Sequence, residues 1–187
     1  INGLGEAAAA GQSARIVAKM NALTDETLIR ALIAAGQRGV KIDLIVRGAC
    51  MLPPGVPGLT DNVRVRSVIG RFLEHSRVFY FRQGQTDELY LSSADWMNRN
   101  MLRRVELAWP VNDKVQRQRI VDESLVAYLH DGVDAWDLLP NGDYVRVNSR
   151  REAGAGMAHG AQAALMGRYS TAGLKRDNGR GVVKGGR

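Results

Sequence analysis

The sequence predicts an α/β protein, with a mixed sheet flanked by helices and a βαβ unit at its start. Residues 15–20 and 40–46 have the apolar composition of strands, and the segment between them repeats apolar residues at helical spacing. Residues 78–81 and 89–91 are β-branched or aromatic runs around a polar segment that contains glycine, which indicates a hairpin. A chain of 187 residues with 45% hydrophobic residues is long enough to bury the core of one domain.

The first three elements are predicted in the order strand, helix, strand. Residues 15–20 form the first strand, and Thr24 or Asp25 caps the helix that follows. Gly39 ends this helix, and residues 40–47 then alternate with the period of two that is typical of a strand. Two strands joined through a helix are expected to lie parallel, with a right-handed crossover.

The middle of the chain is predicted to contain a loop, a strand and the turn of the hairpin. Residues 50–60 contain three prolines and two glycines, which predicts a loop. Residues 63–69 return to extended structure, and residues 82–88 are the predicted turn between the two hairpin strands.

A strand, a long helix and a small hairpin are predicted for the C-terminal half. Residues 104–109 are a strand candidate, and Asn112 or Asp113 is the expected cap of a helix that ends near His130. Residues 138–147 are interrupted by a Pro-Asn-Gly turn, which predicts a terminal hairpin.

The formal charge of +7 is concentrated near the C-terminus. Six Lys or Arg residues stand against one Asp from Arg168 onward, whereas residues 1–145 are neutral in sum. We predict that residues 148–187 form a Gly-rich basic tail that is partly helical or disordered. A polyanion-binding arm is the alternative interpretation, and nucleic acid is not expected as a partner.

Cysteine and histidine usage limits the possible classes of site. The single Cys50 excludes an internal disulfide framework and fits a reducing cytosol. One Cys and three scattered His residues do not form a zinc site of any usual spacing, so we expect no metal site. No window reaches the ~18 uninterrupted apolar residues of a membrane span. We expect a cytoplasmic protein, with peripheral association with a membrane left open.

Polar side chains gather at the open end of the predicted hairpin. Residues 74–77, Glu-His-Ser-Arg, come just before its first strand, and residues 92–95, Ser-Ser-Ala-Asp, follow its second strand. Because these strands are neighbours, both groups are expected to face one pocket at an edge of the sheet. An imidazole, guanidinium groups and small hydroxyls supply the charge-assisted donors that a phosphate site needs.

Four residues are candidates for this phosphate site. Arg47 lies at the carboxyl end of a parallel strand, where open α/β sheets bind ligands, although a solvent-facing charge has the same spacing. Lys19 ends the first strand at the same edge. Arg104 begins the strand predicted after the Ser-Ser turn, from which its side chain can point back into the pocket. His75 is the candidate catalytic residue, with a structural histidine at a strand start as the alternative.

Four motifs carry a resemblance to a known family. ARIVAKMN at 14–21, VKIDLIVRG at 40–48, RFLEHSRVFYF at 71–81 and YLSSADWMNRN at 90–100 closely resemble the C-terminal part of the long, multidomain bacterial polyphosphate kinase. The resemblance implies a phospholipase D-like fold for residues 14–147. Residues 1–13 are then expected to be a residual linker or the end of a preceding domain.

The resemblance also implies an activity and its participants. In that family the terminal phosphate of ATP is transferred reversibly to inorganic polyphosphate, through a phosphohistidine in the preceding domain. The Mg²⁺ ligands are expected in that domain too, so this fragment alone is expected to be inactive. The arginine that matches Arg47 contacts nucleotide phosphates, and the histidine that matches His75 belongs to the ATP site. Expected partners are ATP or ADP, polyphosphate, the preceding domains and, at full length, further copies of the chain.

Two other functions remain open at this point. His75-Ser76-Arg77, followed by residues 92–95, partly resembles the His-x-Lys site of phospholipase D-type hydrolases. Arg77 stands where Lys is expected, Arg82 stands where Asp is expected, and the chain carries one such motif where a phosphodiesterase needs two. The other possibility is a non-catalytic polyanion-binding module that depends on the basic tail.

Overall fold

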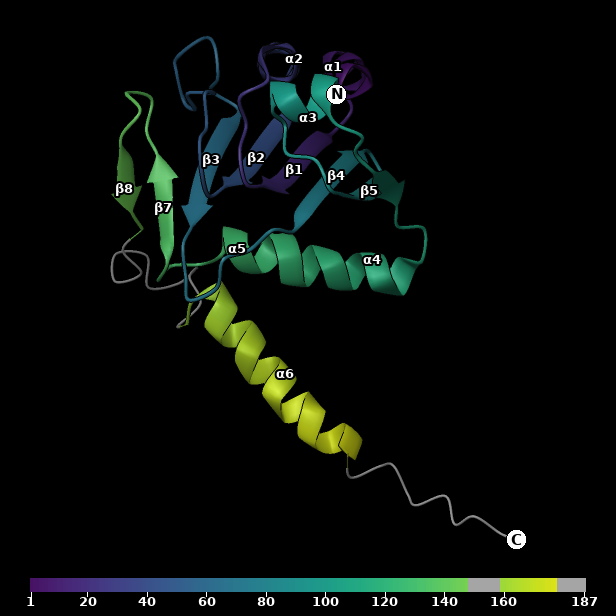
Figure 1. Ribbon diagram of the computed structural model, residues 1–187. Helices are drawn as coiled ribbons and strands as arrows, with labels where there is room; N and C mark the ends of the chain where they lie inside the picture. Colours follow the sequence, from purple (N-terminus) through teal and green to yellow (C-terminus); the bar gives the residue numbers. More distant parts are fainter. Residues whose placement is uncertain (148–158, 178–187) are drawn as a thin grey trace, which may run out of the picture.

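The computed structural model describes residues 1–147 and 159–177, and these residues form a central sheet with helices on both faces (Figure 1). The strands are β1 (Ala14–Met20), β2 (Lys41–Val46), β3 (Val63–Val68), β4 (Arg77–Gln83), β5 (Thr86–Ser92), β6 (Ala108–Pro110), β7 (Ala135–Leu138) and β8 (Tyr144–Arg146). The helices are α1 (Asn2–Ala9), α2 (Glu26–Gln37), α3 (Asn98–Arg103), α4 (Lys114–Ile120), the π-helical segment η1 (Val121–Val126), α5 (Ala127–Leu129) and α6 (Ala161–Asp177).

The sheet is mixed, as the sequence predicts. Within the described residues it has eight strands in the order β6-β5-β4-β1-β2-β3-β7-β8. The three central strands β1, β2 and β3 are parallel, and every other neighbouring pair is antiparallel. Because β4 runs antiparallel to β1, the amino end of β4 lies beside the carboxyl end of β1.

The βαβ unit formed by β1, α2 and β2 is confirmed. The Asp25 carboxylate accepts a hydrogen bond from the Leu28 N–H at 3.0 Å, which caps the first turn of α2. The helix ends at Gln37, just before Gly39, and β2 then pairs with β1 in parallel register. Before this unit, α1 adds Leu4 to the core and packs against α2.

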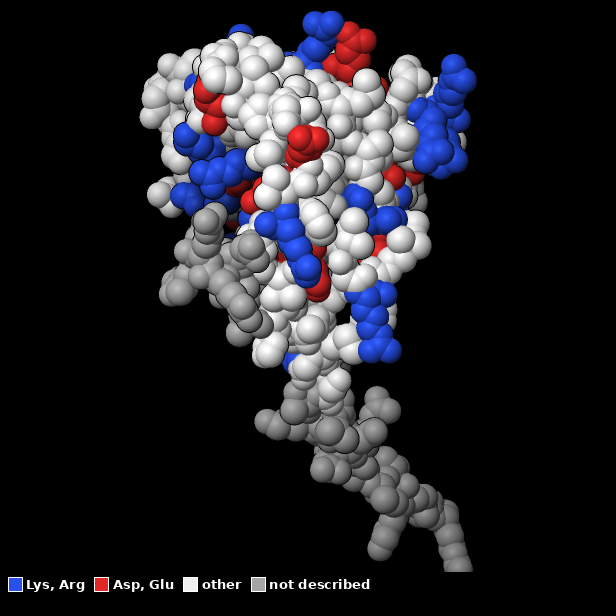
Figure 2. Space-filling view, turned by 90° about the vertical axis from the view of Figure 1, so that its left-hand side faces the viewer, with Lys and Arg blue, Asp and Glu red and all other residues white. Residues whose placement is uncertain are grey.

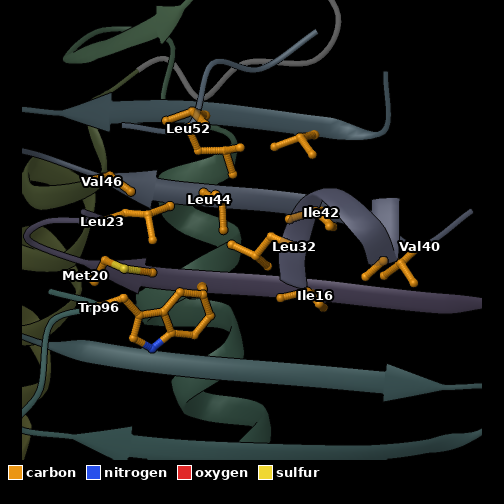
Figure 3. Close-up of a cluster of buried hydrophobic side chains, with 14 of the residues drawn as sticks. Ile16, Met20, Leu23, Leu32, Val40, Ile42, Leu44, Val46, Leu52 and Trp96 are labelled. Carbon is orange, nitrogen blue, oxygen red and sulfur yellow. The ribbon is translucent and has the colours of Figure 1, made fainter. Parts of the chain in front are cut away.

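The larger hydrophobic core lies between the sheet and the α1–α2 layer (Figure 3). Alternate residues of β1 and β2 point toward it, together with Leu32 of α2, and Leu52 and Trp96 enter from loops. The indole of Trp96 stacks on Phe79 of β4 at 4.8 Å between ring centroids. Burial of each large apolar side chain stabilises the fold by about 1.5–3 kcal/mol. This packing ties the loop after β5 to the central strands.

A second core fills the opposite face of the sheet, beneath α4, η1 and α5. Val17, Ile45 and Val78 of the sheet pack here, in one cluster with Leu125 and Tyr128. The predicted long helix is confirmed in its extent, and Asp113 caps it through the Gln116 N–H at 2.8 Å. Its middle, η1, is π-helical, which hydrophobic spacing alone does not reveal.

Three predicted elements differ from the structure in extent. The terminal hairpin, predicted at residues 138–147, begins earlier, because β7 starts at Ala135, and it ends with β8 at Arg146. The loop between β4 and β5 is only residues 84–85, not 82–88, because Arg82 and Asp87 stand opposite each other as a cross-strand pair of unlike charge. Gly84 has φ of +55°, the conformation that a two-residue turn needs at its first position. Residues 104–107 are not a strand, because the Glu106 side chain turns back to bind Ser93 and Asn100, and β6 begins only at Ala108.

The C-terminal region is described in part. Residues 148–158 and 178–187 of the predicted tail lie outside the described residues. Residues 161–177 form α6, whose first turn is buried against the domain before the helix runs away from the sheet (Figure 1). On the face shown in Figure 2, Lys and Arg side chains stand in separate groups with acidic side chains between them. The described residues in this view therefore do not form one continuous basic surface.

Candidate functional site

The candidate site lies at the edge where β1 and β2 end and β4 begins. Lys19 and Asn21 come from the end of β1, and Arg47 follows β2. The loop before β4 brings Glu74 and His75 to the same edge, because β4 pairs antiparallel with β1. The structure thus brings together three of the four predicted site residues, which come from three separate segments of the chain.

Arg47 is half-buried and held through one nitrogen only. Its Nε lies 2.7 Å from Asn21 Oδ1 and 2.8 Å from the Glu74 carbonyl oxygen, and it donates to both. Among the described residues, its two terminal nitrogens have no hydrogen-bond partner. A guanidinium fixed at Nε with its outer fork open is suited to bind an anion with two oxygens.

Lys19 lies at the predicted edge, but its ammonium is paired inside the protein. The residue is 6% exposed, and its Nζ lies 2.8 Å from Glu74 Oε2 and 3.3 Å from the ring centroid of Tyr128. The Tyr128 hydroxyl donates to the other oxygen of Glu74. Burial lowers the pKa of Lys19 and raises the pKa of Tyr128, and the Glu74 carboxylate opposes the first shift and adds to the second. These three side chains form a closed cluster, and they hold the loop that carries His75.

His75 is exposed and adjoins this cluster through the backbone. Its carbonyl oxygen accepts from Arg77 Nη1 at 2.8 Å, and the carbonyl of the residue before it accepts from Arg47. No hydrogen bond or ion pair of the imidazole itself is formed within residues 1–147 and 159–177. The imidazole is therefore open to a ligand, and its residue directly follows Glu74, whose carbonyl oxygen binds Arg47.

Asp95 links the turn after β5 to the same edge. Its carboxylate accepts two hydrogen bonds from the Arg77 guanidinium, at 3.2 and 3.0 Å, and one from the Asn21 N–H at 2.7 Å. Burial by itself raises the pKa of Asp95, but these hydrogen bonds outweigh it and hold the pKa below the usual 3.8. The two polar groups at the open end of the hairpin therefore meet, as predicted, and the ion pair of Arg77 and Asp95 joins them.

Arg104, the fourth candidate, is not part of this cluster. It is exposed just after α3, on the segment where the predicted strand is absent. No hydrogen bond or ion pair links it to Lys19, Arg47 or the loop before β4 in the described part of the chain. Its charge acts on Glu106, whose pKa is lowered first by hydrogen bonds from Ser93 and Asn100 and also by Arg104. Arg104 therefore lies by the Ser-Ser turn rather than beside Arg47.

Tyr128 is a site residue that the sequence pattern does not single out. Helical spacing marks it as a core residue, and the residue is indeed only 3% exposed in the second core. Its hydroxyl donates to Glu74 and its ring lies beneath the Lys19 ammonium, so the residue also reaches the edge of the site. A tyrosine on the apolar side of a predicted helix, whose buried hydroxyl needs a hydrogen-bond partner, is the one signal in the sequence.

The described residues contain neither a metal-binding cluster nor a membrane-spanning helix. Within residues 1–147 and 159–177, no three His, Cys, Asp or Glu side chains gather into a metal site. None of the helices in this part of the chain is both long enough and apolar enough to cross a bilayer.

Comparison with known proteins agrees with the resemblance seen in the motifs. Residues 1–157 match the family described as polyphosphate kinase C-terminal domain 2. The chain is 51% identical over 164 residues to a polyphosphate kinase of Paraburkholderia phytofirmans, and 50% identical over 162 residues to one of Burkholderia lata. These alignments cover 88% and 87% of this chain, but only 23% of each relative. The chain thus spans about a quarter of the length of the curated relatives it matches.

A solved structure of a polyphosphate kinase gives the same result. The crystal structure of polyphosphate kinase from Porphyromonas gingivalis matches with a TM-score of 0.79 and 36% identity, over 90% of this chain and 26% of that chain. A phospholipase D family member, Nuc from Salmonella typhimurium, matches at a TM-score of 0.45 and 14% identity, over 64% of this chain. From the family match over residues 1–157, we conclude that this chain belongs to the polyphosphate kinase C-terminal domain 2 family.

Proposed function

We propose that this chain is the part of a polyphosphate kinase that binds ATP and inorganic polyphosphate. The observation that carries the proposal is the half-buried Arg47, whose outer nitrogens are open and whose Nε binds the carbonyl of the residue before the exposed His75. Two such donors at the carboxyl edge of parallel strands are suited to the oxygens of a phosphate chain. The parent protein, meaning the longer polyphosphate kinase in which we place this chain, supplies the rest of the reaction.

The two residues have separate roles in the proposed reaction. Arg47 binds phosphate oxygens and offsets their negative charge during transfer of the terminal phosphate. His75 binds a phosphate oxygen or helps to protonate the departing group. Phosphoryl transfer depends mainly on positioning and charge stabilisation, which this pair supplies. The covalent phosphohistidine belongs to a preceding domain of the parent protein, so His75 is not the phosphorylated nucleophile.

Magnesium belongs to the proposal only through the parent protein. ATP enters such reactions with Mg²⁺, but the described residues of this chain offer no cluster of carboxylates or imidazoles for a metal. We therefore assign the metal ligands to the preceding domain. A cytoplasmic location and assembly of the full-length protein into a homo-oligomer complete the proposal.

The hydrolase alternative has less support from the geometry. A phospholipase D-type motif needs a lysine at position 77, and Arg77 is instead bound to Asp95 and to the His75 carbonyl. A polyanion-binding module would depend on the basic tail rather than on Arg47.

Titration of the 187-residue chain with ATP, and separately with polyphosphate, tests the proposal. We expect binding of both ligands but no synthesis of polyphosphate from ATP. Arg47→Ala and His75→Ala should each weaken ATP binding by roughly 1.5–3 kcal/mol. Arg30→Ala, which alters an exposed pair on α2, is the matched control and should leave binding unchanged. Robust synthesis by the chain, phosphodiester cleavage, or binding lost only on removal of the tail would each contradict the proposal.

A further inference from the structure

The loop between β3 and β4, residues 69–76, has few contacts of its own to hold it in place. Ile69, Phe72 and Leu73 expose much of their side chains to solvent. Apolar side chains in water do not fix a loop, so its position depends on a small number of hydrogen bonds. The loop carries both Glu74 and His75, so whatever holds it also sets the geometry of the candidate site.

One of these supports comes from the first turn of α6. Gln162 Oε1 accepts a hydrogen bond from the Phe72 N–H at 2.8 Å, and Gln162 Nε2 donates to the Phe72 carbonyl at 3.0 Å. The amide thus pairs with both backbone groups of one residue, as a neighbouring strand does in a ladder. Phe72 lies in the same short loop as His75, so this contact restrains the backbone from which the imidazole projects.

The surroundings of Gln162 hold its amide in position. Gln162 is 6% exposed, and a Cβ at Gly70 would come within 2.5 Å of its Oε1. The loop can approach this closely only because residue 70 is glycine. The neighbouring Ala161 is fully buried, and its N–H donates to the Asp131 carboxylate at 2.7 Å. This bond anchors the start of α6 to the body of the domain.

We propose that Gln162 is a positioning residue for the nucleotide site, which holds the loop of residues 69–76 so that His75 stays beside Arg47. That the ligand is a nucleotide rests on the proposed function. The contact between Gln162 and the loop is independent of it. Gln162 lies beyond residue 157, where the family match ends, so the support comes from a helix outside the matched region. The closed cluster around Glu74 holds the loop from the sheet side, and Gln162 holds it from the opposite end.

Hydrogen exchange of the 187-residue chain tests the loop contact without any ligand. Gln162→Ala should speed exchange of the amides of residues 70–76 about tenfold, the factor expected from the loss of one or two net hydrogen bonds. Gln162→Met keeps the length and burial of the side chain but makes neither hydrogen bond, so it should speed loop exchange as much as alanine does. Gln118→Ala removes another helical glutamine that makes one side-chain hydrogen bond, to Asp122, and should leave the loop unchanged.

A second measurement connects the loop to the site. Gln162→Ala should raise the Kd for ATP about three- to tenfold, and the same change in a His75→Ala background should have no further effect. Such coupling is not expected of a residue that only stabilises the fold.

Each outcome decides one of the two proposals. Unchanged loop exchange in Gln162→Ala, or an affinity loss that is equal with and without His75, would overturn the positioning role. If Gln162→Ala lowers the melting temperature of the whole chain, Gln162→Met, which keeps the buried volume, replaces it, and faster exchange confined to the loop supports the proposal. If the wild-type chain binds neither ATP nor polyphosphate, the proposed function fails, and the exchange experiment still decides whether Gln162 holds the loop.

Discussion

Glu74 connects the two halves of the candidate site through different atoms. Its carboxylate binds the Lys19 ammonium and the Tyr128 hydroxyl, while its carbonyl oxygen accepts from Arg47. Desolvation offsets most of the attraction within a buried ion pair, but removal of one partner leaves an uncompensated charge. A substitution at Glu74 should therefore affect both the stability of the domain and the placement of Arg47.

We predict that Glu74→Ala lowers the free energy of unfolding by about 3 kcal/mol, because the buried Lys19 ammonium loses its partner. Urea unfolding of the purified chain measures this loss. The additional change Lys19→Met removes the stranded charge and should restore part of the stability.

The exposed pair of Glu26 and Arg30 on α2 provides the control for Glu74. Its side chains are 77% and 76% exposed, so Arg30→Ala should cost about 0.5 kcal/mol or less. A loss at Glu74 no larger than this control, or a double variant less stable than Glu74→Ala, would show that the cluster does not hold the loop.

The lowered pKa of Asp95 makes the stability of the folded chain depend on pH. Its pKa is lower in the folded chain than the ordinary 3.8, so the carboxylate form is favoured by folding. This stabilisation is present above the unfolded pKa and is lost as the pH falls through the lowered folded pKa. We predict that the urea midpoint of the wild-type chain falls more steeply than that of Asp95→Asn between about pH 4 and pH 2.

The measurement is a series of urea titrations at different pH values. The wild-type chain should be the more stable of the two at neutral pH, and the two curves should converge in acid. A gap between them that is constant across the whole pH range would contradict the role assigned to the Arg77 and Asn21 hydrogen bonds.

At the scale of elements, local signals predicted the strands and caps better than the connections. Asp25 and Asp113 cap their helices as expected, because the capping bond is made to backbone groups only three residues away. The hairpin turn and the strand after α3 differ because distant or cross-strand partners decide them. Arg82 remains in its strand opposite Asp87, and Glu106 is drawn back to Ser93 and Asn100.

The same distinction explains how far the site was predictable. Arg47, Lys19 and His75 reach one edge because strand order alone places their segments there. The pairing of Lys19 with Glu74 and Tyr128 depends on how a helix crosses the end of β1, which spacing along the chain does not encode. The contact of Gln162 with Phe72 joins positions 90 residues apart and has no local signal at all.

At the scale of the whole molecule, the two hydrophobic cores hold different parts of the candidate site in place. The core on the α2 side fixes the parallel strands and, through Trp96, the turn after β5. The core on the opposite face fixes the helix that carries Tyr128, and it includes Ala161 at the start of α6. The candidate site lies at the strand ends between these layers, so both cores and α6 determine its shape.

From the position of α6 we predict different melting midpoints for two truncated chains. Removal of residues 171–187 leaves the buried start of the helix and the Tyr169 contacts with Arg119 and Glu123 in place, so the melting midpoint should change by about 2 °C or less.

Removal of residues 159–187 takes away Ala161 and Gln162 and leaves one oxygen of the buried Asp131 carboxylate without its N–H donor. We expect this deletion to lower the free energy of unfolding by about 2–4 kcal/mol, or the melting midpoint by about 5–10 °C. The loss has three sources: the unsatisfied buried acceptor, the two lost hydrogen bonds to Phe72 and the newly exposed apolar surface. Calorimetry on both chains measures the difference. Equal midpoints would mean that α6 does not hold the domain, whereas a large loss from the shorter deletion would mean that the helix beyond Ser170 packs on the body of the protein.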